Sequence, residues 1–580
     1  MDSVGKFRFW MGNEYFDNET KAELKMIEND SKEIEERFYK ELEFGTGGLR
    51  GIIGAGTNMM NIYTVRKASQ GLANYVLKQG KEKEKRSIAI AYDCRHMSRE
   101  FALEAACVFS QNGIKAYLFD ELRPTPELSF AVRHLNASAG VVVTASHNTK
   151  EYNGYKVYGE DGAQISPKVS EAVLNEMNRI KDITKISPMD KQEAMDKGLI
   201  EFIGKEIDDE YIARLKTLCV NTGVIKRAAD SLKIVYTPIH GTGNKLVRRI
   251  LAETGFKNVL TVSEQENPDP DFSTVKSPNP ENRDALERAI ELAKKENADI
   301  AIGTDPDCDR LGMAVRDTQD DYVVLTGNQV GCLMMEYVLS QKKEMGELPK
   351  NGFVIKTIVS TELARRIAEN FNIALVETFT GFKFICEKIK ELDEFGNMKF
   401  LFGFEESYGY LMGTFVRDKD GVVASMLAAE MAAYYKSRGM SVCEGLQELY
   451  RKYGYSREEV TSFILEGKEG LEKIGQAMSE LRKARPSRFG AHEVAAVRDY
   501  LVGERCNMDA MKIEPLPLSE SNVLYYEMKD GSWFCIRPSG TEPKIKIYIE
   551  VSDKTTDAAE NKLKNLKKDV MEVVGRLLGA

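Results

Sequence analysis

The sequence predicts an α/β fold class: three mixed α/β domains followed by a C-terminal α+β domain. A chain of 580 residues is too long for one hydrophobic core, and about 150 residues per domain suggests four domains. Apolar, β-branched runs alternate with helical patterns over most of the chain, which favours largely parallel sheets covered by helices. Near the C-terminus, successive strand-like runs precede one long amphipathic helix, which favours α+β.

The predicted elements follow one another in order along the chain. Strand-like "RSIAIAYD" precedes helix-like "SREFALEAACVFSQNG", and "IKAYLFD" and "GVVVTA" follow as strands. The alternation returns in "LKIVYTP" and "GNKLVRRILAETG", in "ADIAIGTD", in "GFVIKTIVS" and "TELARRIAENFN", and in "KFLFGFEES". Polar stretches between such segments place the predicted domains at residues 1–210, 211–325, 326–455 and 456–580.

The composition argues against several classes of protein. Hydrophobic residues at 42% and charged residues at 29% are ordinary for a soluble globular protein. A formal charge of −9 argues against nucleic acid as the main partner. No apolar run approaches the ~18 residues of a membrane span, and the N-terminal segment lacks an apolar signal core. We therefore expect a cytoplasmic protein with no membrane partner.

Cysteine and histidine usage limits the metal chemistry. The nine cysteines are scattered without a C-x-x-C pair, which fits reduced thiols better than disulfides or a zinc site. The five histidines include no pair at metal-ligand spacing. Any metal is therefore expected on oxygen ligands.

The stretch "GVVVTASHN" (140–148) ends a buried-strand pattern in Ser146, His147 and Asn148. Such residues suit a plain strand-to-loop turn, or they present Ser146 for chemistry at the rim of a sheet. Adjacent residues of an extended segment point opposite ways, so Ser146 and His147 are not expected to form a hydrolase dyad. No G-x-S-x-G elbow surrounds the serine either. Lys156, a few residues on, could return to the same pocket.

The stretch "ADIAIGTDPDCDR" places Asp305, Asp307 and Asp309 after a buried strand. Three neighbouring carboxylates repel one another unless a hard cation gathers them, and oxygen-only ligands indicate Mg²⁺ or a similar ion. An EF-hand loop would need Gly and Glu where Arg310 and Arg316 stand, and the D-x-D-x-T pattern of aspartyl phosphatases is absent. The apolar strand before the loop disfavours a plain acidic solvent loop.

Two further loops offer groups for a phosphorylated sugar. In "GFEESYGY" (403–410), Glu405 and Ser407 follow another buried strand, and carboxylates suit hydrogen bonding to vicinal sugar hydroxyls. Arg417 and Lys419 follow soon after and suit an anionic ligand.

The stretch "RPSGTEPKIKIYIE" is a candidate phosphate cradle. Arg537 supplies a guanidinium fork, Ser539 and Thr541 supply hydroxyls, and Gly540 lets backbone N–H groups approach a phosphate. It is not a Walker A sequence, and a tight hairpin turn is the alternative.

Taken in this order, the motifs resemble those of the α-D-phosphohexomutases, the phosphoglucomutase/phosphomannomutase superfamily. The resemblance runs from "FGTGGLRG" (44–51) through "TASHN", "DPDCDR", "TGFKF" and "GFEESYGY" to "RPSGTEP", which is nearly the whole chain. It implies four domains around one central cleft, each contributing one loop. It also implies an intramolecular phosphotransferase that acts on sugar phosphates with one Mg²⁺ per chain.

The resemblance implies roles for the motif residues. Ser146 would be the phosphoserine and a metal ligand, beside Asp305, Asp307 and Asp309. Lys156 would be the general base, with His147 as a weaker candidate. Substrate contacts are expected from Arg50, Arg310, Lys383, Glu405, Ser407, Arg417, Arg537, Ser539, Gly540 and Thr541.

The implied reaction consists of two phosphoryl transfers. Phosphoserine gives its phosphoryl to the sugar phosphate, which produces a bisphosphate. The bisphosphate reverses its orientation in the cleft and returns its other phosphate to Ser146. For glucose, the intermediate and activator is glucose 1,6-bisphosphate. A catalytically silent sugar-phosphate sensor is disfavoured, because a sensor needs neither Ser146 nor the three aspartates.

The sequence departs from commoner family patterns at two loops. The metal loop has Pro306 and Cys308 where many members have Gly and Ala, and neither side chain is an expected ligand. The sugar loop reads F-E-E-S-Y-G-Y, which resembles the branch of bacterial α-phosphoglucomutases and animal phosphopentomutases. We therefore predict a phosphoglucomutase, with phosphopentomutase and phosphomannomutase as alternatives.

Overall fold

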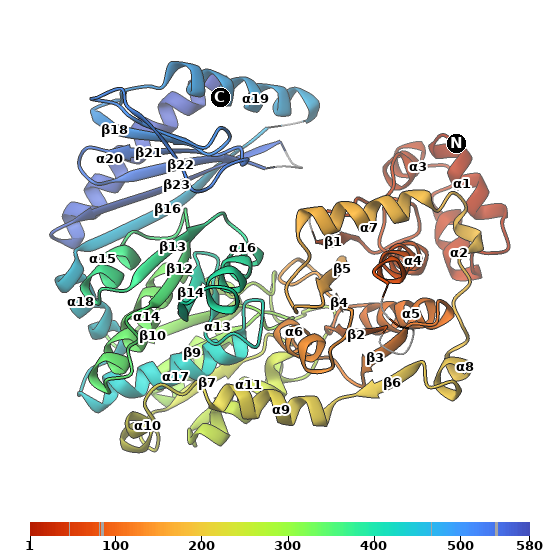
Figure 1. Ribbon diagram of the computed structural model, residues 1–580, viewed down its shortest axis with the longest axis horizontal. Helices are drawn as coiled ribbons and strands as arrows, with labels where there is room; N and C mark the ends of the chain where they lie inside the picture. Colours follow the sequence, from red (N-terminus) through yellow and green to blue (C-terminus); the bar gives the residue numbers. More distant parts are fainter. Residues whose placement is uncertain (46, 81, 83–85, 466, 540–542, 580) are drawn as a thin grey trace. The chain divides into compact units, whose positions relative to one another are not determined.

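The computed structural model describes residues 1–580 except 46, 81, 83–85, 466, 540–542 and 580 (Figure 1). The chain forms two compact units. The first unit consists of Met1–Phe353 and Gly381–Cys443, and the second of Val354–Thr380 and Glu444–Ala580. Within the described part of the chain, no helix has the length and apolar character needed to cross a membrane.

Three short helices open the first unit: α1 (Ser3–Gly12), α2 (Asn18–Met26) and α3 (Ser31–Phe38). An aspartate at each N-cap accepts hydrogen bonds from first-turn N–H groups. An aromatic cluster packs the helices against α4 (Ile62–Lys78), with Trp10 stacked on Phe16 and edge-on to Tyr63 of α4. The helices therefore share a core with the sheet domain that follows.

The first sheet has the strand order β1-β5-β4-β2-β3-β6. Its strands are β1 (Gly48–Ile52), β2 (Ser87–Tyr92), β3 (Lys115–Phe119), β4 (Ala139–Val143), β5 (Tyr152–Gly159) and β6 (Ile200–Ile203). The four strands β2, β3, β4 and β6 run parallel, as predicted. Strands β4 and β5 are antiparallel, because the loop between them is too short for a parallel crossover. The serine loop is this connection.

Helices cover the faces of this sheet, and every residue of β2 and β4 is buried. Together with α4, these helices are α5 (Ser98–Gln111), α6 (Thr125–His134), α7 (Pro167–Arg179) and α8 (Lys191–Asp196), with a 3₁₀ turn η2 (Ile183–Lys185). A completely buried β4 gives the serine loop a rigid support.

The second sheet has the order β11-β10-β9-β7-β8. Its strands are β7 (Ile234–Thr237), β8 (Val259–Thr261), β9 (Ile300–Thr304), β10 (Leu311–Arg316) and β11 (Tyr322–Val324). Strands β7, β8 and β9 are parallel, whereas β10 returns antiparallel beside β9. Its helices are α9 (Lys205–Lys216), α10 (Thr222–Ala228), α11 (Gly243–Thr254), α12 (Ser263–Glu266) and α13 (Arg283–Glu296). The aspartate loop is the β9–β10 connection, and the predicted domain boundary at 210 falls inside α9.

The third group of elements is divided between the units. In the first unit, β14 (Lys399–Glu405) pairs antiparallel with β15 (Gly409–Leu411). The helices there are α14 (Gly327–Glu344), α16 (Phe382–Ile389) and α17 (Gly421–Ser437), with a π-helical turn η3 (Lys390–Glu394). Strand β12 (Gly352–Thr357) continues into the second unit, where its neighbour is β13 (Ala374–Thr378) and α15 (Leu363–Asn370) connects the two.

The C-terminal sheet of the second unit has the order β16-β23-β22-β21-β18-β19-β20, with β17 beside β18. Its pairings are antiparallel. The strands are β16 (Tyr455–Ile464), β17 (Arg488–Phe489), β18 (His492–Asp499), β19 (Glu504–Asn507), β20 (Ile513–Pro515), β21 (Leu524–Met528), β22 (Trp533–Pro538) and β23 (Lys544–Asp553).

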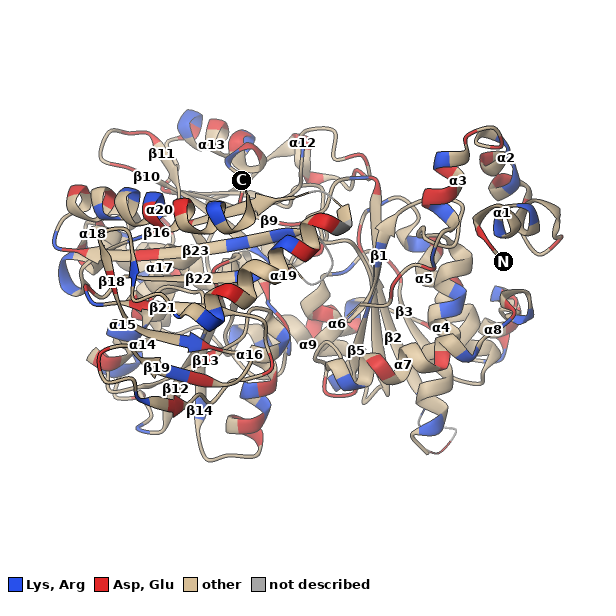
Figure 2. Ribbon diagram, turned by 90° about the horizontal axis from the view of Figure 1, so that it is seen from above, with Lys and Arg blue, Asp and Glu red and all other residues tan. Residues whose placement is uncertain are grey.

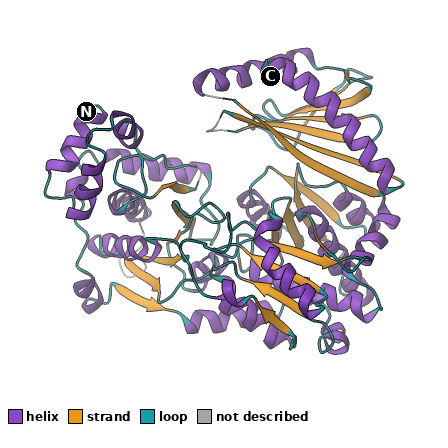
Figure 3. Cartoon of the chain, turned by 180° about the vertical axis from the view of Figure 1, so that it is seen from behind, coloured by secondary structure: helices purple, strands orange, loops and turns teal. Residues whose placement is uncertain are grey.

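Helices α19 (Gly467–Ala484) and α20 (Thr556–Leu578) pack beside this sheet (Figure 3), and α18 (Val442–Tyr453) precedes it. Charged residues mark the outer side of α20 along its length (Figure 2), whereas Leu566, Val570 and Val574 are buried in the core. This amphipathic packing is the one predicted for the C-terminal tail.

Candidate active site

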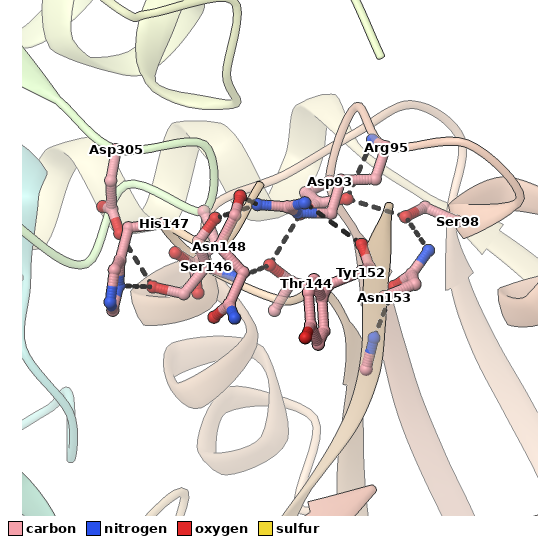
Figure 4. A network of polar contacts seen from close by, with 12 residues as sticks. Asp93, Arg95, Ser98, Thr144, Ser146, His147, Asn148, Tyr152, Asn153 and Asp305 are labelled. Atoms are coloured by element: carbon pink, nitrogen blue, oxygen red, sulfur yellow. Dashed lines mark hydrogen bonds and ion pairs between the residues drawn. The ribbon is translucent and has the colours of Figure 1, made fainter. Parts of the chain in front are cut away.

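The serine loop follows the end of the buried strand β4 (Figure 4). Ser146 is 3% exposed, and its φ of +54° lies in the left-handed region. Its Oγ lies 3.2 Å from His147 Nδ1. The expectation that these two side chains point apart is therefore wrong, because it assumed an extended backbone at Ser146.

The serine hydroxyl also reaches the second sheet. Ser146 Oγ donates to Asp305 Oδ2 at 2.9 Å. Burial, followed by the positive charges of Arg310 and Arg50, lowers the pKa of His147 to about 2. The imidazole is therefore neutral at physiological pH. In the contact with Ser146 Oγ, His147 Nδ1 donates or accepts according to the tautomer of the ring.

The aspartate cluster consists of Asp305, Asp307 and Asp309 in the β9–β10 loop. All three are buried, and their ligand oxygens lie within 4.8 Å of one another. Asp305 Oδ1 accepts the backbone N–H groups of Asp309 at 3.1 Å and Arg310 at 3.0 Å. Asp307 Oδ1 and Asp309 Oδ1 accept no hydrogen bond from any described residue. Buried acceptors without donors are costly, so these oxygens suit a divalent cation.

Two lysines approach the aspartate cluster. Lys156 Nζ lies 2.8 Å from Asp307 Oδ2 and 3.6 Å from Asp309 Oδ2. Lys419 Nζ lies 3.0 Å from Asp309 Oδ2, and Thr125 Oγ1 donates to Asp307 Oδ2 at 2.9 Å. Arg310 Nε also lies 3.8 Å from Asp309 Oδ1, but Arg310 is paired with Glu281 as well, and Lys419 with Asp418. Five carboxylates therefore share three cations, which leaves the cluster short of positive charge.

The protonation of the cluster follows from this geometry. Burial raises the pKa of Asp305 well above its usual value, and the charges of Asp307 and Asp309 add to the rise. Burial by itself would lower the pKa of Lys156, but the charges of Asp307 and Asp309 outweigh it and raise that pKa. Lys156 therefore holds its proton while the carboxylates face it. Its role as general base stays a prediction.

A glycine-containing turn at residues 240–243 packs against the backbone of the aspartate loop. The segment "HGTG" leads into α11, and Thr242 N donates to the carbonyl of Pro306 at 2.8 Å. A Cβ at Gly241 would collide with the Pro306 backbone, and one at Gly243 would crowd Cys308 Sγ. Sequence reasoning did not identify this support, although two glycines before a helix were a visible signal.

The sugar loop joins β14 to β15 and lies next to the aspartate loop. Glu405 is buried at the end of β14, and Gly409 forms a backbone bridge with Arg310. The Lys419 side chain packs against the backbone of Gly409. Burial raises the pKa of Glu405 to about 7, with Lys419 opposing the rise. Glu405 and Ser407 therefore stay candidates for sugar contacts beside the cluster.

Other predicted residues of the first unit lie in different surroundings. Arg50 donates to Asn148 Oδ1 of the serine loop at 3.0 Å. Arg417 is buried, and its guanidinium pairs with Glu394 rather than with the aspartate cluster. Burial lowers the pKa of Lys383 on α16. Lys419, which sequence reasoning noted but did not select, is the cation of its segment that reaches the aspartates.

The predicted phosphate cradle belongs to the second unit. Arg537 lies near the end of β22, and Ser539 N donates at 2.7 Å to the carbonyl of Lys544, the first residue of β23. Gly540 and Thr541 lie outside the described residues. The cradle and the cleft that it was expected to share with the other loops stay predictions.

Models of the phosphoglucomutase/phosphomannomutase domains match four parts of the chain in order. The α/β/α domains I, II and III match residues 41–184, 209–318 and 326–453, and the C-terminal domain matches residues 477–566. The predicted fold class, three α/β domains and a C-terminal domain, is therefore confirmed.

Relatives cover nearly the whole chain. Phosphoglucomutase of Staphylococcus aureus (strain N315) is 38% identical over 543 residues, which are 93% of this chain and 95% of the relative. Phosphoglucomutase of Staphylococcus haemolyticus is 39% identical over 519 residues, 89% of this chain and 92% of the relative.

Two solved structures share the fold. The Paramecium phosphoprotein pp63/parafusin, a phosphoglucomutase in an open form, has a TM-score of 0.70 at 17% identity and covers 93% of this chain and 97% of its own. A phosphoglucomutase/phosphomannomutase family protein of Burkholderia thailandensis has a TM-score of 0.66 at 18% identity, with 92% and 97% covered. The chain therefore belongs to the phosphoglucomutase/phosphomannomutase family and is an intramolecular phosphotransferase.

Proposed function

We propose that the protein is a phosphoglucomutase that interconverts glucose 1-phosphate and glucose 6-phosphate through phosphorylated Ser146. The observation that carries the proposal is the buried Ser146 hydroxyl, 2.9 Å from Asp305 in the aspartate cluster. A plain strand-to-loop turn needs neither a left-handed serine nor three carboxylates around it. Glucose as the sugar is supported by relatives named phosphoglucomutase at 38% and 39% identity.

The aspartate cluster and the Ser146 side chain would hold one Mg²⁺. When bound, the ion would offset negative charge on the phosphoryl group in transfer. Lys156 and Lys419 bring two further positive charges to the same place. Carboxylates that ligated a cation would attract the Lys156 ammonium less, which would make its proton easier to release and so suit a general base.

The chemistry consists of two balanced phosphoryl transfers. In the first, the bond between Ser146 Oγ and phosphorus breaks, and a bond from a sugar hydroxyl oxygen to phosphorus forms. The proton of the sugar hydroxyl passes by way of Lys156, our first candidate, or His147 to the Ser146 oxygen that is released. The resulting glucose 1,6-bisphosphate reorients in the site. The bond between its other phosphorus and the sugar oxygen then breaks as Ser146 Oγ bonds to that phosphorus, and the Ser146 hydroxyl proton passes back to the released sugar oxygen.

The sugar must be recognised in two opposite orientations. Hydroxyls at C3 and C4 lie near the middle of the bisphosphate and are shared by both orientations, and Glu405 and Ser407 offer an acceptor and a hydroxyl for them. Arg50, Arg310, Lys383 and Arg417 are proposed as further contacts. Arg537, Ser539, Gly540 and Thr541 would hold the phosphate that is not being transferred.

Turnover of several sugar phosphates tests the proposal. Purified protein with Mg²⁺ and glucose 1,6-bisphosphate is assayed for kcat/KM on glucose 1-phosphate, mannose 1-phosphate and ribose 1-phosphate. Glucose 1-phosphate is expected to be the best substrate, and mannose 1-phosphate a poorer one, since the two sugars differ only at C2. Ribose 1-phosphate is shorter and should be poor.

The same assay separates the alternatives. A higher kcat/KM for ribose 1-phosphate would make the protein a phosphopentomutase, and a higher value for mannose 1-phosphate would make it a phosphomannomutase. Binding of all three sugars without turnover would indicate a sensor. Intact-mass analysis with peptide mapping should place the stable phosphate on Ser146, and a phosphate elsewhere in an active enzyme would overturn the mechanism.

A further inference from the structure

The backbone N–H and the carbonyl of Ser146 are both connected by hydrogen bonds to one buried ion pair, that of Asp93 and Arg95 (Figure 4). Ser146 N donates to Thr144 Oγ1 at 2.8 Å, and Thr144 Oγ1 donates to Asp93 Oδ2 at 2.6 Å. On the other side, Arg95 donates to the Ser146 carbonyl at 2.6 Å. The side chains of Asp93 and Arg95 are both 0% exposed and lie 3.2 Å apart. The ion pair therefore holds the serine peptide from both ends.

The Arg95 guanidinium also organises the rest of the serine loop. It donates to the carbonyls of Thr149 at 2.7 Å and Tyr152 at 3.1 Å, and to that of Asn148. Carbonyls that turn inward need a donor, and one planar group supplies it for four of them. A lysine ammonium cannot match this arrangement, because its three donors radiate from a single atom.

Other elements hold the ion pair in place. Ser98 Oγ donates to Asp93 Oδ1 at 2.7 Å, and Asn153 of β5 donates to Ser98 Oγ at 3.0 Å. The Phe272 ring, from the segment between α12 and α13, lies 5.0 Å from the Arg95 guanidinium. Phe272 is itself in the left-handed region, with φ of +48°. Elements of the first sheet and the segment between α12 and α13 therefore meet at Arg95.

We infer that Arg95, backed by Asp93, is a positioning residue that keeps Ser146 in the left-handed conformation from which its hydroxyl faces Asp305. The inference rests on the proposed function of Ser146 as the phosphorylated residue. Arg95 touches the backbone of Ser146 but not its hydroxyl. Its loss should therefore slow phosphoryl transfer in both directions and leave sugar binding unchanged.

The test compares Arg95→Lys and Arg95→Ala with Arg66→Lys as the matched control. Arg66 forms an ion pair with Glu104 at 2.6 Å in the same domain, with side chains 15% and 20% exposed, and its recorded partners lie outside the serine loop. The readouts are kcat and KM for glucose 1-phosphate, and the rate at which glucose 1,6-bisphosphate phosphorylates Ser146, followed by intact mass. A displacement near 1 Å costs roughly 100-fold, so the Arg95 variants should lose about that factor in kcat and in phosphorylation rate.

Two further signatures distinguish positioning from general support. KM should stay at the wild-type value in the Arg95 variants, and added guanidinium ion should restore part of the lost rate in Arg95→Ala. Arg66→Lys should lower the melting temperature while keeping kcat and the phosphorylation rate. Wild-type phosphorylation rates in a folded Arg95→Lys, or a loss confined to KM, would overturn the inference.

Thr144→Val decides the matter if the Arg95 variants do not fold. It preserves the side-chain shape and removes the hydroxyl that links Ser146 N to Asp93. The inference requires a lower kcat and phosphorylation rate at unchanged KM, and wild-type rates would overturn it. If wild-type protein takes up no phosphate on Ser146, the proposed function fails first and the inference falls with it, before any variant is compared.

Discussion

The aspartate cluster of the first unit and a second charged cluster, in the second unit, bury ionised groups in different ways. We call the latter the Lys356 cluster, and its members are Lys356, Glu362, Arg365, Glu377, Arg498, Arg505 and Glu527. Lys356 Nζ lies 2.8 Å from Glu362 and 3.0 Å from Glu377. Arg365 pairs with the same two glutamates at 2.6 Å and 3.0 Å. Both glutamates are therefore paired with the same two cations.

The balance of charge separates the two clusters. In the Lys356 cluster three carboxylates face four cations. Glu527 forms ion pairs with Arg498 at 2.5 Å and with Arg505 at 2.6 Å. In the aspartate cluster the three aspartates share Lys156, Lys419 and Arg310 with two further carboxylates, Glu281 and Asp418, so five carboxylates face three cations. Asp307 Oδ1 has no hydrogen-bond donor among the described residues. We therefore expect the Lys356 cluster to be structural and the aspartate cluster to bind a cation.

The largest expected effect is at the unbalanced cluster. Ser146→Ala should lower kcat by roughly 10³-fold or more, since loss of a nucleophile removes the reaction path itself. Its melting temperature should stay near that of the wild type. The control is Ser360→Ala, which removes a buried hydroxyl 2.9 Å from Thr357 Oγ1 in the second unit. The Ser360→Ala variant should lose stability and keep its activity. An active Ser146→Ala would show that the Ser146 hydroxyl is not needed for the reaction.

The balanced cluster should show the opposite response. Lys356→Met leaves Glu362 and Glu377 without their fully buried cation. Breaking such a pair typically costs about 3–5 kcal/mol, so the free energy of unfolding in urea should fall by about that amount. The kcat of the folded fraction should not change. A stable variant with reduced kcat would mean that the cluster serves the reaction.

A smaller effect is expected on metal binding, and it can be tested by replacing one carboxylate of each cluster with the isosteric amide. Mg²⁺ at about 100 times its Kd should raise the wild-type free energy of unfolding by about 2.7 kcal/mol, and excess chelator should abolish activity. Asp307→Asn should lose most of this stabilisation, because it removes a ligand charge. Glu377→Gln should keep it. Equal stabilisation of both variants would exclude the aspartate cluster as the metal site.

The smallest expected effect is the pH dependence of the free energy of unfolding, which involves one buried carboxyl group in each unit. Burial, opposed by Lys419, raises the pKa of Glu405 to about 7, and burial with the charges of Glu458 and Glu362 raises that of Glu550 to about 7. Both lie above the usual 4.5, so the folded chain binds these protons more tightly than the unfolded chain. Their stabilisation is complete below about pH 4.5 and is lost as the pH rises through about 7.

From pH 6 to pH 8, each group should therefore lower the free energy of unfolding by about 1 kcal/mol. Denaturant unfolding across this range checks the expectation. Glu405→Gln and Glu550→Gln should each reduce the decrease in unfolding free energy between pH 6 and pH 8 by the contribution of the group that was replaced. Only Glu405→Gln should also change the pH profile of kcat/KM. An unchanged slope in Glu550→Gln would contradict its raised pKa.

Much of the fold was predictable because its signals are local. The alternation of buried strands with helices is visible within short windows, and the models of domains I to III confirm it. The aspartate cluster was predictable for the same reason, since three carboxylates within five residues after an apolar strand leave few alternatives. The antiparallel return of β5 was not predicted, although the short loop before it was a signal.

Side-chain direction in irregular segments was not predictable. Arg417 and Lys419 stand two residues apart, and only the folded backbone determines that Lys419 reaches Asp309 while Arg417 meets Glu394. The contact between Ser146 and His147 depends on one positive φ angle. The Lys356 cluster draws on residues from 356 to 527, and no local pattern joins positions so far apart.

The discontinuous second unit has a consequence for biosynthesis. Residues Val354–Thr380 belong with Glu444–Ala580, so β12 and α15 leave the ribosome well before the sheet that completes their core. Nearly 200 residues separate Lys356 from Glu550, and at about 5–20 residues per second their synthesis takes roughly 10–40 s. For most of that interval the Lys356 cluster lacks Arg498, Arg505 and Glu527. A translational pause after residue 380 would lengthen the period in which a chaperone can hold this segment, while the serine and aspartate loops are already complete.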